Sequence, residues 1–114
     1  INPNDINSLW SLTLVSILRN RPNDADIHLQ RLEELIENNP WPSSYRTVVN
    51  LAALKPWKAS VIAKTASKKY NSSVLNGLSD LSGILGGRFW LIPSATKSIP
   101  IAIKDVELSL LKGN

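Results

Sequence analysis

The chain has 114 residues, 43% of them apolar and 19% charged, which is the composition of one folded domain with a modest core and excludes a disordered tail. Cysteine is absent, which excludes disulfides and thiolate metal sites, and no apolar run approaches the roughly 20 residues that span a bilayer. The net charge is +4, but residues 1–40 carry three basic and six acidic side chains, while residues 41–114 carry ten basic and three acidic ones. The resulting balances of −3 and +7 predict an acidic partner for the second part of the chain.

Residues 1–40 predict a hairpin of two helices. Asn4 or Asp5 caps the first helix, which runs to Arg19. The second helix runs from residue 23 to residue 38 with four apolar side chains on its inner face: Ile27, Leu32, Leu35 and Ile36. The first helix has an apolar stripe at three- and four-residue spacing: Ile6, Leu9, Trp10, Leu14, Ile17 and Leu18.

Leu12 and Val15 fall outside that stripe, so the first helix is apolar on more than one side. Such a helix is either central in its fold or buried against a partner. We therefore take Trp10, Leu12 and Val15 as candidate residues of a dimer interface, and residues 1–40 as a dimerisation or packing element.

The stretch at residues 39–44 predicts a linker, because Pro40 and Pro42 disfavour a helix there. Ser43 or Ser44 then caps a helix to Leu54, and another helix begins at Pro56 and ends at residue 68 or 69. Its alanines, at positions 59, 63 and 66, favour close approach of another helix.

Asn71 or Ser72 caps the next helix, and two glycines at positions 86 and 87 end it. Its predicted buried seam has spacings of four, three and four: Val74, Leu78, Leu81 and Leu85. Residues 88–92 and 99–103 are bulky and strand-like, and the polar loop 93–98 between them makes a predicted β-hairpin. The tail at residues 104–112 favours a last helix.

The order of two short helices, a glycine stop and a hairpin resembles the winged helix-turn-helix superfamily. The residues that carry the resemblance lie within residues 44–103: Ile62, Ala63, Lys64, Ala66, Asn71, Ser72, Ser73, Val74, Leu78, Leu81, Gly86, Gly87, Arg88 and Phe89. The predicted fold is therefore mainly α (α+β), with a helical hairpin at 1–40 and a winged-helix domain with a two-stranded wing at 41–114.

The resemblance implies binding of double-stranded DNA, with the helix at 72–85 in the major groove and the wing on phosphate or the minor groove. Basic side chains supply the predicted backbone contacts, namely Lys58, Lys64, Lys68, Lys69, Arg88 and Lys97. Small polar side chains supply modest base contacts, namely Ser72, Ser73 and Asn76. The same helix has no Arg or Lys, which the commonest specific base contact requires.

Two hypotheses of function follow. The first is a DNA-binding domain of a larger regulatory or chromosome-associated protein, in the nucleus or nucleoid. The alternative is a winged-helix domain for protein–protein association, often as a homodimer, within a larger assembly. Ile at residue 1 and the absence of Met indicate a domain taken from a longer protein, or a processed chain.

An enzyme is not predicted, and no cofactor or metal is expected. His28, the single histidine, lies on an acidic helix without a nucleophile beside it. The glycines lack the spacing of a phosphate-binding loop.

Overall fold

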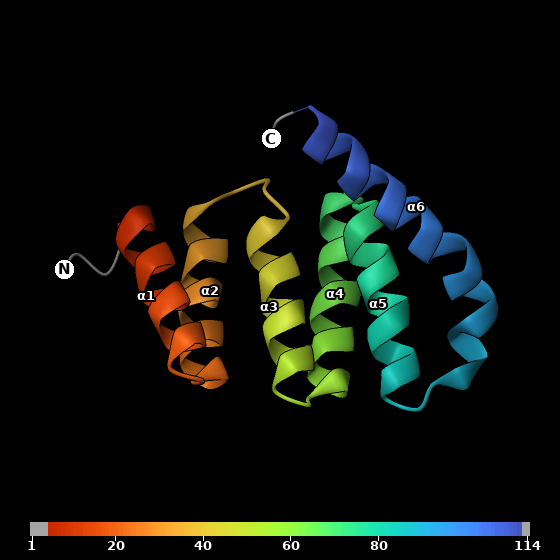
Figure 1. The fold of residues 1–114 in the computed structure, drawn as a ribbon, viewed down its shortest axis with the longest axis horizontal. Coiled ribbons are helices and arrows are strands. Elements are labelled where there is room, and N and C mark those ends of the chain that lie inside the picture. The colour runs from red at the N-terminus through yellow and green to blue at the C-terminus, as the bar shows by residue number, and fades with distance from the viewer. Residues whose placement is uncertain (1–4, 113–114) are drawn as a thin grey trace.

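Six α-helices follow one another along the chain, and each packs against the next, in the computed structural model, which describes residues 5–112 (Figure 1). A short 3₁₀ turn, η1, precedes the last helix. The bounds are α1 Ile6–Leu18, α2 Pro22–Leu35, α3 Trp41–Ala52, α4 Pro56–Tyr70, α5 Ser73–Leu85, η1 Phe89–Leu91 and α6 Ile92–Leu111. Within residues 5–112 the protein is all-α and contains no strand.

The helices form three hairpins whose turns share one backbone design. Asn20, Leu54 and Gly87 follow α1, α3 and α5, and each has a positive φ, of 56°, 61° and 96°. In each turn the next residue's amide donates, over 2.8 Å, to a carbonyl five residues earlier, as in Arg21 to Ser16. This is the Schellman arrangement, which ends a helix in a left-handed residue. The three turns are 34 and 33 residues apart, so the chain repeats one helical hairpin three times.

The starts of α1, α4 and α5 confirm the predicted caps Asp5 and Ser72 and the predicted first-turn proline Pro56. Asp5 caps α1 by accepting from the Asn7 amide at 3.2 Å, and Ser72 caps α5 by accepting from the Leu75 amide at 3.3 Å. Pro22 and Pro56 lie in the first turns of α2 and α4, where the missing amide costs no hydrogen bond. The alternative cap at Asn4 lies outside the described residues.

The predicted winged-helix fold is wrong, because both expected wing strands are helical. Residues 88–92 contain η1 and the start of α6, and the expected wing tip at 93–98 together with residues 99–103 lies inside α6. The β-branched isoleucines favoured a strand locally. Small residues at helical spacing favour the helix instead, because Ser98 and Ala102 let α6 lie close against Gly77 of α5, and Ala95, three residues before Ser98, is buried as well. The predicted helix at 104–112 is the end of α6, which runs to Leu111.

The predicted linker at residues 39–44 is also mostly helix. The α3 helix begins at Trp41, with Pro42 in its first turn. A proline disfavours a helix interior but is compatible with the first turn, so the two prolines mark a helix start. The boundary proposed at residue 40 falls in this turn, and packing continues across it, since Val49 of α3 shares a core with Leu9, Leu29 and Leu32.

Small residues make the closest helix contacts. The second core, around Leu75, contains Ala63 and Ala66 of α4, as the spacing of the alanines predicted. In α1 the buried residues are Leu9, Thr13 and Ser16. Many large apolar side chains lie at the surface, including members of the three apolar faces that the sequence predicted: Leu14, Ile17, Leu18, Ile27, Leu81 and Leu85.

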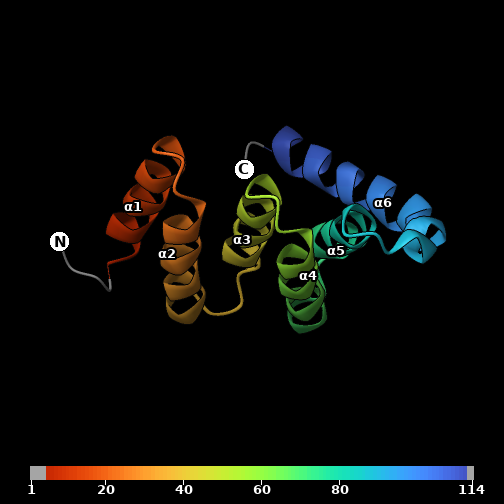
Figure 2. The same ribbon diagram turned by 90° about the horizontal axis from the view of Figure 1, so that it is seen from below.

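The helices are arranged in two layers, with α1 and α3 on one side and α2 and α4 on the other (Figure 2). The α6 helix crosses over α5 at the end of the molecule opposite to α1 (Figures 1 and 2). The principal extents are 46 × 32 × 24 Å. The two terminal elements of the array are therefore far apart, and each leaves a different surface uncovered.

Candidate binding surfaces

A buried ion-pair network joins α2, α3 and α4 and uses one of the predicted DNA-binding residues. Asp26, 2% exposed, accepts hydrogen bonds from Arg46 Nε at 2.9 Å, Asn50 Nδ2 at 3.0 Å and Lys58 Nζ at 3.1 Å. Arg46 also donates to both carboxylate oxygens of Glu33, at 3.2 and 3.1 Å. Lys58 is therefore engaged within the fold and is not a free cation for phosphate.

This network lowers the pKa of Asp26. Burial by itself raises the pKa of a carboxyl group, but the hydrogen bonds from Arg46, Lys58 and Asn50 favour the charged form and outweigh it. The pKa of Arg46 is raised in turn, because its carboxylate partners outweigh its own burial. The network thus holds both groups charged and locks three helices together.

Four of the predicted DNA-binding residues do come together, in a polar cleft of about 570 Å³ between α4, α5 and η1. They are Lys64 and Lys68 of α4, Asn76 of α5, and Arg88. A second hollow of about 490 Å³ shares Ser67, Lys68 and Asn76 with this cleft and contains Ser72 and Ser73. We call the two hollows together the basic trough.

Ser72 and Ser73 also have structural partners at the end of the trough. Ser72 is the N-cap of α5, and the Ser73 hydroxyl donates a short hydrogen bond to Asp105 of α6. Asn76 is exposed on α5. The predicted base-contacting residues are therefore brought together, but two of them serve the helix start and the contact with α6.

The remaining predicted cations lie elsewhere. Lys69 lines a different pocket with Glu33 and Arg46, and its Nζ lies 5.1 Å from the centre of the Tyr70 ring. Lys97 is exposed on α6 and lines neither hollow of the trough. Lys97 does not have the position that the resemblance implied, because the expected wing tip lies inside α6.

An acidic residue and an aromatic ring complete the trough. Asp80 accepts hydrogen bonds from Ser94 Oγ at 2.8 Å and Ser98 Oγ at 2.5 Å, both on α6, and is itself buried. Trp90 of η1 lines the same cleft and is 74% exposed. Sequence reasoning missed Trp90 because residues 88–92 were assigned to a strand.

An apolar groove lies between α5 and α6. Its volume is about 360 Å³, and its walls are almost entirely aliphatic: Val74, Gly77, Leu78 and Leu81 from α5, and Ile99, Ala102, Ile103 and Val106 from α6, with Glu107 at the edge. The α5 side is the seam that the sequence predicted as buried. On the α6 side, Ile99, Ile103 and Val106 are spaced by four and three residues, which is the spacing of a helix. The prediction of a strand at residues 99–103 did not take this spacing into account.

The opposite end of the molecule exposes a stripe on α1. Leu14, Ile17 and Leu18 are 58%, 45% and 85% exposed. Ile17 and Leu18 follow Leu14 by three and four residues, which places both beside Leu14 on one side of the helix. We call them the α1 stripe. Trp10, on the same helix, contacts Tyr45 of α3 with ring centres 5.3 Å apart, and the ring centres of Trp41 and Tyr45 are 6.2 Å apart.

The candidate dimer residues occupy different positions on α1. Trp10 is half-buried and packs against the first core cluster, and Leu12 is half-buried as well. Val15 is exposed at 42%. Leu14 and Leu18 are therefore the most exposed large apolar side chains of α1, and Val15 is about as exposed as Ile17.

No group of three or more His, Asp or Glu residues within residues 5–112 is arranged to hold a metal ion. In the same part of the chain, no helix has the length and apolar character needed to cross a membrane. No known protein family, no curated protein and no solved structure matches the chain significantly.

Proposed function

We propose that this protein is a self-associating helical module in which the α1 stripe of one copy occupies the α5–α6 groove of the next. The observation that supports it is the pairing of two uncovered apolar features at opposite ends of one array. The stripe is convex and helical, and the groove is concave and aliphatic. An amphipathic helix in an apolar groove is a recurrent mode of protein recognition.

The groove is long enough for the stripe. Leu14 to Leu18 spans about 6 Å of helix at 1.5 Å per residue. The groove walls, from Val74 to Leu81 and from Ile99 to Val106, each span about 10 Å by the same measure. The turn of α1 that carries the three stripe residues therefore fits along the groove.

The charges allow this approach. Asp26 and Glu33 are neutralised internally by Arg46 and Lys58, so the remaining charges sum to −1 in residues 1–40 and +5 in residues 41–114. The nearly neutral α1–α2 hairpin can approach the basic part of a second copy without repulsion. Because the contact itself is apolar, we expect association to persist at high salt.

The contact is heterologous, since a patch at one end meets a different patch at the other. Such contacts produce rings or open chains. One helix stripe in a short groove buries less area than a standard interface, so we expect a dissociation constant on the order of micromolar.

Solution mass tests the proposal through a matched pair of variants. Leu14 and Ile27 are 58% and 60% exposed, on α1 and α2 respectively, and only Leu14 belongs to the α1 stripe. We expect Leu14→Asp to give a monomer at concentrations where the unmodified protein and Ile27→Asp both associate. Sedimentation equilibrium over a range of concentrations measures this, and a monomeric unmodified protein at the highest concentration would reject the proposal.

A further inference from the structure

The basic trough is lined by charged residues that take no part in the proposed self-association. Lys64, Lys68 and Arg88 converge there, and none of them has an ion-pair partner among the residues that the structure describes. Asp80 contributes one negative charge, so the net charge of the lining is +2. Hydroxyl groups from Ser94 and Ser98 hold that carboxylate at the contact between α5 and α6.

Trp90 adds a feature that a simple anion does not require. Its ring is 74% exposed and lines the same cleft as the three cations. An exposed ring beside converging cations suits a ligand that carries phosphate together with a free, flat base. Base stacking on aromatic side chains, combined with a basic groove that follows the backbone, is how proteins bind single-stranded nucleic acid.

The trough also has an elongated course. The shared residues Ser67, Lys68 and Asn76 connect its two hollows, so it continues along α5 from Ser72 toward Asp80 and Trp90. That length is about 12 Å at 1.5 Å per residue. A duplex offers no unpaired base for Trp90, and within residues 5–112 no wing accompanies α5.

We propose that the basic trough binds single-stranded nucleic acid, with Lys64, Lys68 and Arg88 on the phosphates and Trp90 stacked on a base. Asn76, exposed between them, supplies an amide for hydrogen bonds to the backbone or base. The site is independent of the α5–α6 groove, which is lined by other residues of α5.

The test is fluorescence anisotropy with a labelled oligothymidylate of about 12 nucleotides, which is within the site sizes of single-strand binders. Three phosphate contacts predict that log K falls with log salt at a slope of about −2. The double variant Lys64→Glu/Lys68→Glu should lose at least tenfold in affinity. Trp90→Leu should lose about tenfold through the missing stack.

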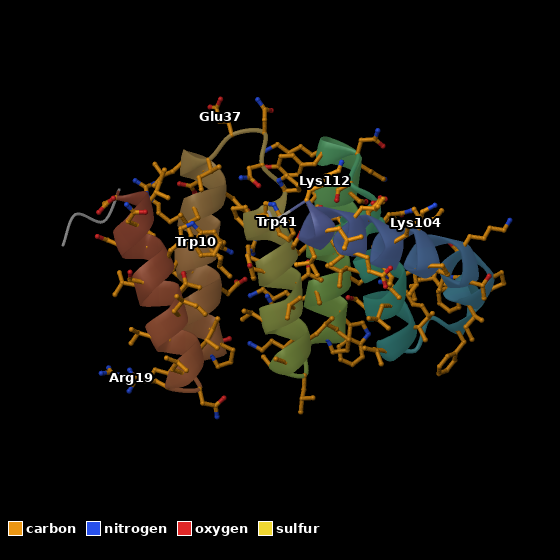
Figure 3. The ribbon with its side chains drawn as sticks, turned by 45° about the horizontal axis from the view of Figure 1, so that its top comes forward. Trp10, Arg19, Glu37, Trp41, Lys104 and Lys112 are labelled. Carbon is orange, nitrogen blue, oxygen red and sulfur yellow. The ribbon has the colours of Figure 1, made fainter. Side chains whose placement is uncertain are left out.

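The control is Lys104→Glu/Lys112→Glu, which makes the same change of charge on α6 and its C-cap (Figure 3). Neither lysine lines the trough. It should retain most of the affinity, and circular dichroism should show all variants folded. A duplex of the same length should bind more weakly. The proposal is overturned by absence of binding at low salt, by equal losses in the trough and control variants, or by duplex binding as tight as single-strand binding with no effect of Trp90→Leu.

Discussion

Asp26 Oδ1 accepts a hydrogen bond from Arg46 Nε at 2.9 Å, and this contact ties the first hairpin to the second. The two side chains are 3% and 12% exposed, so the pair is largely shielded from water. Asn50 and Lys58 satisfy further positions of the carboxylate. The contact between the first two hairpins therefore combines this polar network with the apolar contact of Val49 in the core of Leu9, Leu29 and Leu32.

We expect Asp26→Asn to destabilise the protein by about 3 kcal/mol, because it leaves the Arg46 guanidinium buried beside only one carboxylate. Chemical denaturation at neutral pH measures the change. Glu34→Gln is the control, since the Arg31–Glu34 pair is exposed and such pairs contribute at most about 1 kcal/mol. Equal effects of the two substitutions would contradict the importance of the buried network.

The same residue predicts a dependence of stability on pH. The folded-state pKa of Asp26 lies below its ordinary value of 3.8, so the folded state favours the charged carboxylate. Its contribution is complete above the ordinary pKa and is lost as the pH falls from 3.8 through the folded-state pKa. The difference in unfolding free energy between the unmodified protein and Asp26→Asn should shrink over that range. A difference that stays constant down to pH 2 would argue against this assignment.

Among the three residues with positive φ in the hairpin turns, Leu54 is the least suited to that conformation. Its φ is +61°, a left-handed conformation that costs a leucine about 1 kcal/mol, while Asn20 and Gly87 occupy the equivalent positions. Its side chain is 85% exposed, so substitution loses little packing. We expect Leu54→Asn or Leu54→Gly to raise the free energy of unfolding by about 0.5–1 kcal/mol. Thermal and denaturant unfolding measure this, and a lower stability for both variants would show that the leucine side chain has a packing role.

Two glycines of α5 should respond differently to alanine. A Cβ on Gly77 would lie 2.8 Å from the Ala102 Cβ and 3.3 Å from the Ser98 carbonyl oxygen, so α6 must move. We expect Gly77→Ala to cost about 1–3 kcal/mol. A Cβ on Gly83 meets chiefly the terminal methyl of Leu91, which can rotate away, and alanine favours a helix. Gly83→Ala should be neutral or stabilising in the same unfolding measurement, and the opposite order would contradict the close contact of α5 and α6.

The sequence predicted the five helices up to Gly86 because caps, prolines and glycines act locally. It failed at residues 88–103, where β-branched side chains favour a strand and contacts with α5, such as that of Ala102 with Gly77, accompany a helix. That contact is tertiary, so single-residue propensities do not contain it. The sequence therefore divides α6 into the end of one strand, a loop at 93–98, a second strand at 99–103 and a separate helix at 104–112.

The candidate surfaces were predictable in part. Lys64, Lys68 and Arg88 were selected for their charge, and the fold brings them together although the wing that justified Arg88 is absent. The groove was not predictable, because the seam from Val74 to Leu85 has the spacing of a buried face. Whether that seam is buried depends on how closely the small residues of α5 let α4 and α6 approach it. The hydrophobic periodicity of the sequence does not contain that information.

Crosslinking tests head-to-tail association most directly, because the chain contains no cysteine. One variant carries Leu14→Cys on the α1 stripe, and a second carries Ile103→Cys in the α5–α6 groove. With a short thiol-specific crosslinker, we expect covalent dimers when the two variants are mixed, and monomers when either is treated alone. Crosslinking of Leu14→Cys to itself, or no crosslinking in the mixture at concentrations where the protein associates, would contradict the proposed contact.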